Sequence, residues 1–215
     1  MSKHRAYAGH SSEDIFRFLS PSHGVVLDLG CGGGRHSTYL AKRGLYVIGI
    51  DISIKKLKKG ESGHERIRAD ACRLPFEAKV FDCVLCSEVL EHLVNPDQCI
   101  SEIHRVLKDD SIACLTTPCL NIPIKTLIRF YRKFAGIDPE QSREHLHVFS
   151  SKKLFAMLEP LFEIIDVRYP NFAFTTIERR LGIGYGFDRA LSTIQRKMEL
   201  LHYFAACVWI KVAKR

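Results

Sequence analysis

The chain has 215 residues, of which 46% are hydrophobic, and a formal net charge of +8 at pH 7. This length provides one sizeable core and is too short for two enzymatic domains, so we expect a single domain over residues 1–215. No run approaches the ~20 apolar residues of a membrane-spanning helix. The polar first residues also lack the apolar segment of a signal peptide, which favours a cytoplasmic protein.

The positive charge is concentrated in the second part of the chain. Residues 1–119 carry 16 Lys and Arg against 15 Asp and Glu, whereas residues 120–215 carry 16 against 9. Such an excess is typical of a solvated surface, and also of a protein that meets an anionic substrate, a membrane surface or nucleic acid.

The eight cysteines do not form a zinc pattern. The one Cys-x-x-Cys, Cys83 and Cys86, lies in an apolar run, and a strand there would send side chains three positions apart to opposite faces. We therefore expect reduced, small core residues.

Short apolar runs alternate with helix-like segments along residues 25–117. In chain order we expect strands over 25–30, 46–51, 65–70, 81–87 and 111–117, with helices over 34–43, 53–60 and 96–107. This alternation predicts a doubly wound α/β fold with parallel strands. Ligands bind beyond the carboxyl ends of such strands. Polar or glycine residues stand at four of these ends, namely Gly30, Asp51, Asp70 and Ser87.

The chain changes character after residue 119. We expect a helix over 152–159, a strand over 162–169 and a last strand over 205–213. Residues 20–119 would then form a cofactor-binding part and 120–204 a substrate-side part with helical insertions.

A glycine-rich loop follows the first predicted strand. Gly30, Cys31, Gly32, Gly33 and Gly34 lead directly into a helix, which allows a tight turn and leaves room for a ligand. At the end of the second strand stands Asp51, where a carboxylate can bind both hydroxyls of a ribose. Arg35 occupies the position where a dinucleotide fingerprint needs glycine or alanine, which argues against a nicotinamide dehydrogenase.

The segments VLDLGCGGGR, GIDIS, ADACRLPF and FDCVLCSEVLEHL, in this order and spacing, resemble the class I S-adenosylmethionine-dependent methyltransferases, in particular the small-molecule group called type 11. The resemblance covers residues 24–117 strongly and 145–158 weakly. It implies a seven-stranded Rossmann-like sheet, mostly parallel with an antiparallel last strand, and S-adenosylmethionine as the cofactor.

The resemblance also implies roles for single residues. Asp28 and the loop Gly30–Gly34 would face the methionine part of the cofactor, and Asp51 would hold its ribose. Ile52 would pack on the adenine, Asp70 would accept from the adenine amino group and the Ala71 backbone would donate to the ring. Ser87 would lie beside the transferred methyl group.

The stretch SEVLEHL places Glu88, Glu91 and His92 just after the fourth strand. A helical turn would bring the three side chains to one face, toward the acceptor. His92 could act as a general base oriented by Glu91. The residues could equally be acids placed favourably at a helix start.

A metal site is the third interpretation of this stretch, and it rests on similarity to ubiquinone-pathway O-methyltransferases and small-RNA 2′-O-methyltransferases. It implies that Glu88, Glu91 and His92, together with His147 or His145, hold Mg²⁺ or Mn²⁺. Such mixed ligands suit these ions when waters or substrate oxygens complete the shell.

Two basic amphipathic segments, 122–136 and 187–201, are predicted in the second part of the chain. They could cover the active site, meet a membrane surface or contact nucleic acid. In the first, Tyr131 and Phe134 fall on the apolar side, which makes nucleic acid the weaker partner. The sequence therefore predicts O-methylation of a small or lipid-like acceptor, such as a quinone precursor, a lipid or a glycan. RNA 2′-O-methylation and a non-catalytic cofactor-binding module remain alternatives.

Overall fold

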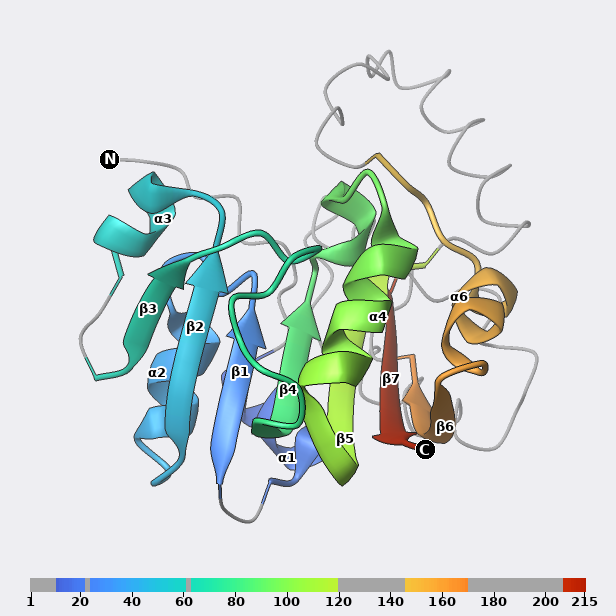
Figure 1. Ribbon diagram of the computed structural model, residues 1–215, viewed down its shortest axis with the longest axis horizontal. Helices are drawn as coiled ribbons and strands as arrows, with labels where there is room; N and C mark the ends of the chain where they lie inside the picture. Colours follow the sequence, from blue (N-terminus) through green and yellow to red (C-terminus); the bar gives the residue numbers. More distant parts are fainter. Residues whose placement is uncertain (1–10, 22–23, 61–62, 120–145, 170–206) are drawn as a thin grey trace, which may run out of the picture.

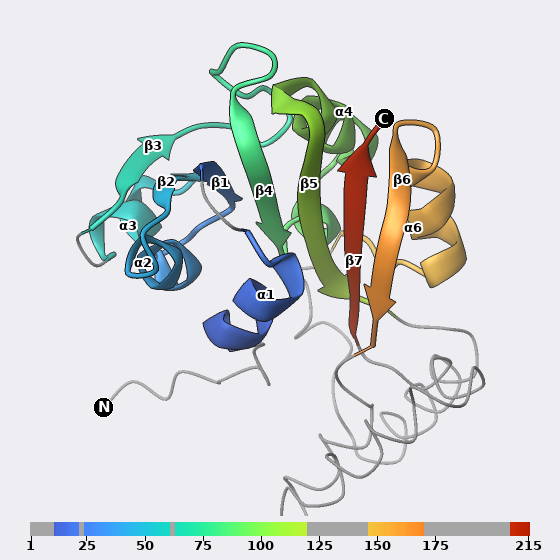
Figure 2. The same cartoon turned by 90° about the horizontal axis from the view of Figure 1, so that it is seen from below.

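The computed structural model describes residues 11–21, 24–60, 63–119, 146–169 and 207–215. Its centre is one seven-stranded sheet with the strand order β3-β2-β1-β4-β5-β7-β6 (Figures 1 and 2). The strands are β1 Val25–Leu29, β2 Tyr46–Asp51, β3 Glu65–Arg68, β4 Phe81–Ser87, β5 Leu107–Pro118, β6 Phe162–Arg168 and β7 Cys207–Lys214. Strand β7 pairs antiparallel with β5 and β6, while the other pairs are parallel. The predicted sheet is thereby confirmed.

Helices pack against both faces of this sheet. They are α1 Ser12–Leu19, α2 Arg35–Ala41, α3 Ile54–Lys58, α4 Pro96–Val106 and α6 Ser151–Leu158, with a short 3-10 helix, η1 Leu90–His92. Figure 2 places α1 and α2 on one face and α4 and α6 on the other. The predicted helices of the described residues are confirmed to within a few residues, whereas the amphipathic segments 122–136 and 187–201 lie outside the described residues.

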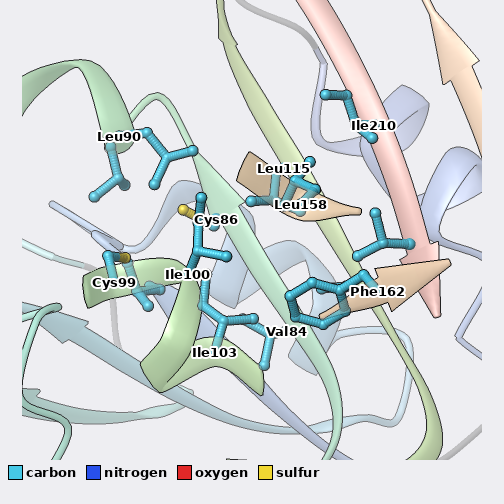
Figure 3. Packing of buried hydrophobic residues seen from close by; sticks show 14 of the residues in the cluster. Val84, Cys86, Leu90, Cys99, Ile100, Ile103, Leu115, Leu158, Phe162 and Ile210 are labelled. Atoms are coloured by element: carbon cyan, nitrogen blue, oxygen red, sulfur yellow. The ribbon is translucent and has the colours of Figure 1, made fainter. Parts of the chain in front are cut away.

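Each face of the sheet has its own apolar cluster. Strand β4 contributes to both, because alternate side chains of a strand point to opposite faces. Cys86 belongs to the cluster that includes residues of α4 and α6, several of which Figure 3 labels, while Cys83 belongs to the cluster with α1, α2 and β7. The two thiols of the Cys-x-x-Cys pair thus face apart, and every cysteine of the described residues is free. The expectation of reduced core cysteines is confirmed there.

Helix α1 is an element that the predicted order of helices and strands lacks. Ser11 caps it by accepting from the Asp14 amide, and its apolar side is buried. Phe18 packs against Trp209 of β7, with ring centroids 5.6 Å apart. Its signal was present as apolar residues at positions 15, 18 and 19 behind a serine, a pattern that is easily missed in an eight-residue helix.

The sheet brings the ends of the central strands together. Strand order reverses between β1 and β4, which both start a crossover at their carboxyl ends. The glycine loop follows β1, and the stretch Glu88–His92 follows β4. Sequence segments almost sixty residues apart therefore meet at this edge.

Candidate active site

The glycine loop is fastened to the end of β2. The backbone N–H of Gly32 donates to Asp51 Oδ2 at 3.0 Å, and that of Ser53 donates to Oδ1 at 2.7 Å. Gly30 and Gly34 have φ of 73° and 79°, which glycine adopts at little cost. Asp51 is 7% exposed, so its carboxylate is desolvated and held by two amides. The loop and the acid predicted to bind a ribose thus form one rigid unit.

The loop presents open space on one side and tight packing on the other. A Cβ at Gly33 would meet no atom within 4 Å, whereas a Cβ at Gly30 would lie 2.3 Å from Val89 Cγ2. The open side is where a ligand can approach the backbone. A cofactor with a ribose and a charged tail fits this arrangement of bare backbone and carboxylate.

Asp28 lies beneath the loop, at 1% exposure. The Ser37 hydroxyl donates to its Oδ2 at 2.5 Å. Burial raises the pKa of Asp28 to about 6, although the hydrogen bonds from Ser37 oppose the shift. Burial, with Asp28 and Asp51 nearby, also raises the pKa of the Cys31 thiol to about 12. Cys31 is therefore a protonated, unreactive residue of the loop.

The residues predicted to hold an adenine ring follow β2 and β3. Ile52 has 63% of its surface exposed, which is unusual for isoleucine and provides an apolar face beside Asp51. Asp70 is exposed, and its Oδ1 accepts the backbone N–H of Cys72 at 2.8 Å in a tight turn that includes Ala71. The structure brings the ends of β1, β2 and β3 to one edge of the sheet (Figure 1).

Polar side chains gather where β4, β5 and β7 meet. Ser87 Oγ and Thr116 Oγ1 lie 2.9 Å apart. The Thr116 hydroxyl donates to Glu88 Oε1 at 3.3 Å, and the Cys207 thiol points to the same oxygen at 3.7 Å. Burial, reinforced by Glu91, raises the pKa of Glu88 to about 7. Sequence reasoning missed Thr116 and Cys207, because the β4–β5 pairing brings Thr116 to Glu88 and the β5–β7 pairing brings Cys207 there.

The predicted α-helical turn that would join Glu88, Glu91 and His92 is wrong. The turn is a 3-10 helix that begins only at Leu90, and Glu88 precedes it with φ of 56°. Glu91 is fully buried and accepts from the Thr117 hydroxyl at 2.9 Å, while His92 is partly exposed. His92 Nε2 and Glu91 Oε1 are 3.9 Å apart, which is beyond hydrogen-bonding distance. The orientation of His92 by Glu91 and a base role for His92 therefore stay predictions.

Glu91 connects the turn to residues 146 and 147. Its carbonyl oxygen accepts the backbone N–H groups of Leu146 and His147, at 2.8 and 3.0 Å. The His147 ring packs near Phe149, with centroids 5.6 Å apart. Glu91 thus stabilises this edge through its buried carboxylate and through its backbone carbonyl, which accepts two hydrogen bonds.

The predicted Mg²⁺ or Mn²⁺ site is not assembled. Among the residues that the structure describes, no three His, Cys, Asp or Glu side chains gather closely enough to hold a metal ion. The predicted ligands have separate partners instead: Glu88 contacts Thr116 and Cys207, and Glu91 accepts from Thr117. His92 Nε2 lies 3.9 Å from Glu91 Oε1, and the His147 ring packs near Phe149. His145 lies outside the described residues.

Comparisons with known proteins agree with the cofactor motifs. Residues 27–115 match the profile of a family described as a methyltransferase domain. The chain is 40% identical over 94 residues to a ubiquinone biosynthesis O-methyltransferase of Hahella chejuensis, covering 39% of this chain and 38% of that protein. It is 29% identical over 121 residues to a malonyl-[acyl-carrier protein] O-methyltransferase of Salmonella typhimurium, covering 54% and 48%. The matches thus span less than half the length of these relatives.

A solved structure extends the likeness to nearly the whole fold. An S-adenosylmethionine-dependent methyltransferase from Methanosarcina mazei superposes with a TM-score of 0.65 at 22% identity, covering 93% of this chain and 96% of that one. At this identity the superposition establishes the fold alone. Residues 27–115 are thus similar to a methyltransferase domain, and the fold is that of S-adenosylmethionine-dependent methyltransferases.

Proposed function

We propose that this protein transfers a methyl group from S-adenosylmethionine to a hydroxyl oxygen of a small or lipid-like acceptor. The observation that carries the proposal is the unit of glycine loop and Asp51, in which Gly32 and Ser53 amides fix the carboxylate beside bare backbone. A carboxylate held in this way is ready to accept from the two hydroxyls of a ribose without reorganisation.

The neighbouring residues can be given roles in cofactor binding on the same grounds. The exposed Ile52 would pack on the adenine, and Asp70 with the Ala71 amide would contact its polar edge. Asp28, buried under the loop, would face the positively charged methionine end. Ser87 would lie beside the methyl group, at the end of β4.

The bound cofactor would supply a methyl group attached to a sulfonium sulfur. The acceptor oxygen would attack the methyl carbon in line with the carbon–sulfur bond and displace the sulfur. The protein must then hold the acceptor at the carboxyl edge of β4 and keep water away from the reacting atoms. The acceptor oxygen forms the new bond to carbon, the bond from carbon to sulfur breaks, and the hydroxyl proton leaves to solvent. These steps balance without a further reactant.

A hydroxyl acceptor is supported by the named relatives, which are O-methyltransferases of ubiquinone biosynthesis and of malonyl-[acyl-carrier protein]. A quinone precursor, a lipid and a glycan all carry suitable hydroxyls. Because the matches cover less than half of those relatives, the acceptor of this chain is inferred from chemistry and not from their names.

Calorimetry with S-adenosylhomocysteine tests the proposal before any acceptor is known. We expect a saturable heat of binding, and a loss of affinity of about 10- to 100-fold in Asp51→Ala, because charge-assisted hydrogen bonds to a buried carboxylate contribute about 1.5–3 kcal/mol. Tighter binding of NAD than of S-adenosylhomocysteine would exclude the proposed cofactor. Binding without transfer to any acceptor pool would favour a non-catalytic module, and salt-sensitive RNA binding would favour an RNA 2′-O-methyltransferase.

A further inference from the structure

Glu88 has a backbone conformation that side chains avoid. Its φ of 56° lies in the left-handed region, where a Cβ crowds the following carbonyl. Its N–H still donates to the Thr116 carbonyl at 2.9 Å, so the ladder between β4 and β5 continues up to this residue. The chain then leaves the sheet abruptly, and Val89 packs over Gly30. Glycine would suit this corner better than glutamate.

The surroundings of the Glu88 side chain also disfavour its ionised carboxylate. Two hydrogen-bond donors from two different strands, the Thr116 hydroxyl and the Cys207 thiol, approach its Oε1. The side chain is half-buried. Burial raises its pKa most, and the Glu91 carboxyl raises it further, so Glu91 lies near enough to repel it. Strain and crowded carboxyls persist in proteins mainly where function requires them.

A purely structural role explains this arrangement poorly. Strands β4 and β5 are already joined by six residue pairs between positions 81 and 87, and strands β5 and β7 by a continuous antiparallel register. The pair Ser87 and Thr116 links the strand ends as well. Removing the Glu88 carboxyl would therefore leave the sheet connected.

The position of Glu88 fits a ligand instead. It follows Ser87 at the carboxyl end of β4, beside the point where strand order reverses and ligands of open α/β sheets bind. The donors at Oε1 fix the plane of the carboxyl, and a carboxylate with fixed lone pairs recognises groups that donate, such as hydroxyls.

We propose that the Glu88 carboxyl binds the hydroxyl group of the methyl acceptor and directs its oxygen toward the transferred methyl. The inference rests on the proposed methyl transfer and adds the residue that selects the acceptor. Glu88 accepts the hydroxyl's hydrogen bond, which orients the oxygen lone pair for attack. It discriminates against ethers and ketones, which have no proton to donate.

Four forms of the full chain test this role: the unaltered protein, Glu88→Gly, Glu88→Gln and the matched control Asp110→Gly. Asp110 also has a positive φ, of 60°, and is exposed near the amino end of β5, remote from Glu88. Three properties are measured: the melting temperature, the affinity for S-adenosylhomocysteine by calorimetry, and transfer of labelled methyl to catechol as a hydroxyl probe.

We expect Glu88→Gly to melt about 2–4 °C higher, because glycine relieves the left-handed strain. Its affinity for S-adenosylhomocysteine should stay within about twofold, while transfer to catechol should fall about 10- to 100-fold. Glu88→Gln keeps the backbone strain, so its melting temperature should not rise as that of Glu88→Gly does. Its transfer of methyl to catechol should nevertheless fall. Asp110→Gly should melt higher and keep full transfer.

Two results would overturn the assignment of Glu88. One is a lower melting temperature of Glu88→Gly, which would make Glu88 a structural residue. The other is unchanged transfer to catechol in either Glu88 variant. If the unaltered chain binds S-adenosylhomocysteine but does not methylate catechol, the hydroxyl assignment is rejected while the cofactor stands. If it fails to bind S-adenosylhomocysteine, the proposed function itself is rejected.

Discussion

At the scale of single residues, burial makes Asp28 a source of pH-dependent stability. Its pKa is about 6 in the folded chain and 3.8 in the reference state, so the folded state holds the proton more tightly than the unfolded state does. Between these two values the folded state carries more protons, and the free energy of unfolding therefore falls as pH rises. Above about pH 6 the full cost of a buried, ionised carboxylate is present, up to about 3 kcal/mol.

We therefore expect Asp28→Asn to stabilise the cofactor-free protein at pH 7.5 by more than at pH 5. The measurement is a pair of denaturant titrations at the two pH values, with Ser37→Ala as a control that weakens the hydrogen bond and retains the carboxyl. An equal gain at both pH values would show that the Asp28 carboxyl does not titrate in this range. If Asp28 meets the methionine amino group as proposed, the same variant should also bind S-adenosylhomocysteine more weakly, because that charge is gone.

At the scale of elements, we expect one glycine of the loop to affect stability and another to affect ligand binding. Gly30 combines a positive φ with a Cβ position only 2.3 Å from the Val89 side chain, whereas Gly33 faces open space and has no positive φ. A methyl group at position 30 must distort the β1–α2 turn or displace Val89. A methyl group at position 33 changes only the space in front of the loop.

Gly30→Ala should accordingly lower the free energy of unfolding by more than about 1 kcal/mol. Gly33→Ala should leave that free energy nearly unchanged and weaken S-adenosylhomocysteine binding by about 10-fold, because it fills the open space in front of the backbone. Thermal melts and calorimetry of the two variants decide the point. Tight binding by Gly33→Ala would mean that the ligand does not approach this part of the loop.

At the scale of the whole molecule, the positive charge is concentrated in the second part of the chain. Residues 120–215 carry an excess of seven positive charges, counting 16 Lys and Arg against 9 Asp and Glu. No helix of the described residues is both long and apolar enough to cross a membrane. A basic surface near a lipid-like acceptor would favour binding at an anionic membrane surface.

This hypothesis of peripheral membrane binding predicts co-flotation with vesicles that contain anionic lipid at low salt. Binding should decline as the ionic strength rises past about 0.15 M, where the Debye length is about 8 Å. Neutral vesicles are the matched control. Failure to float with anionic vesicles at low salt would limit the acceptor to molecules that reach the protein from solution.

The sequence by itself determined the sheet, and it predicted the cofactor and the residues that would face it. Strands such as 46–51 and 81–87 were predictable because their apolar runs are short, continuous and bounded by polar residues, and the acids at 51 and 70 follow such runs directly. The order of these local patterns is enough to specify a doubly wound fold. The family resemblance rests on motifs within these same strands and the loops that follow them.

Only the tertiary structure decided what the stretch Glu88–His92 does. Local spacing predicted an α-helical turn with one shared face, but the Glu88 corner and the Thr117 contact of Glu91 depend on strands that pair with β4 from far along the chain. Cys207 reaches Glu88 only because β7 pairs antiparallel with β5. Contacts of that kind carry no local signal, since the free energy that fixes them comes from packing and not from sequence spacing.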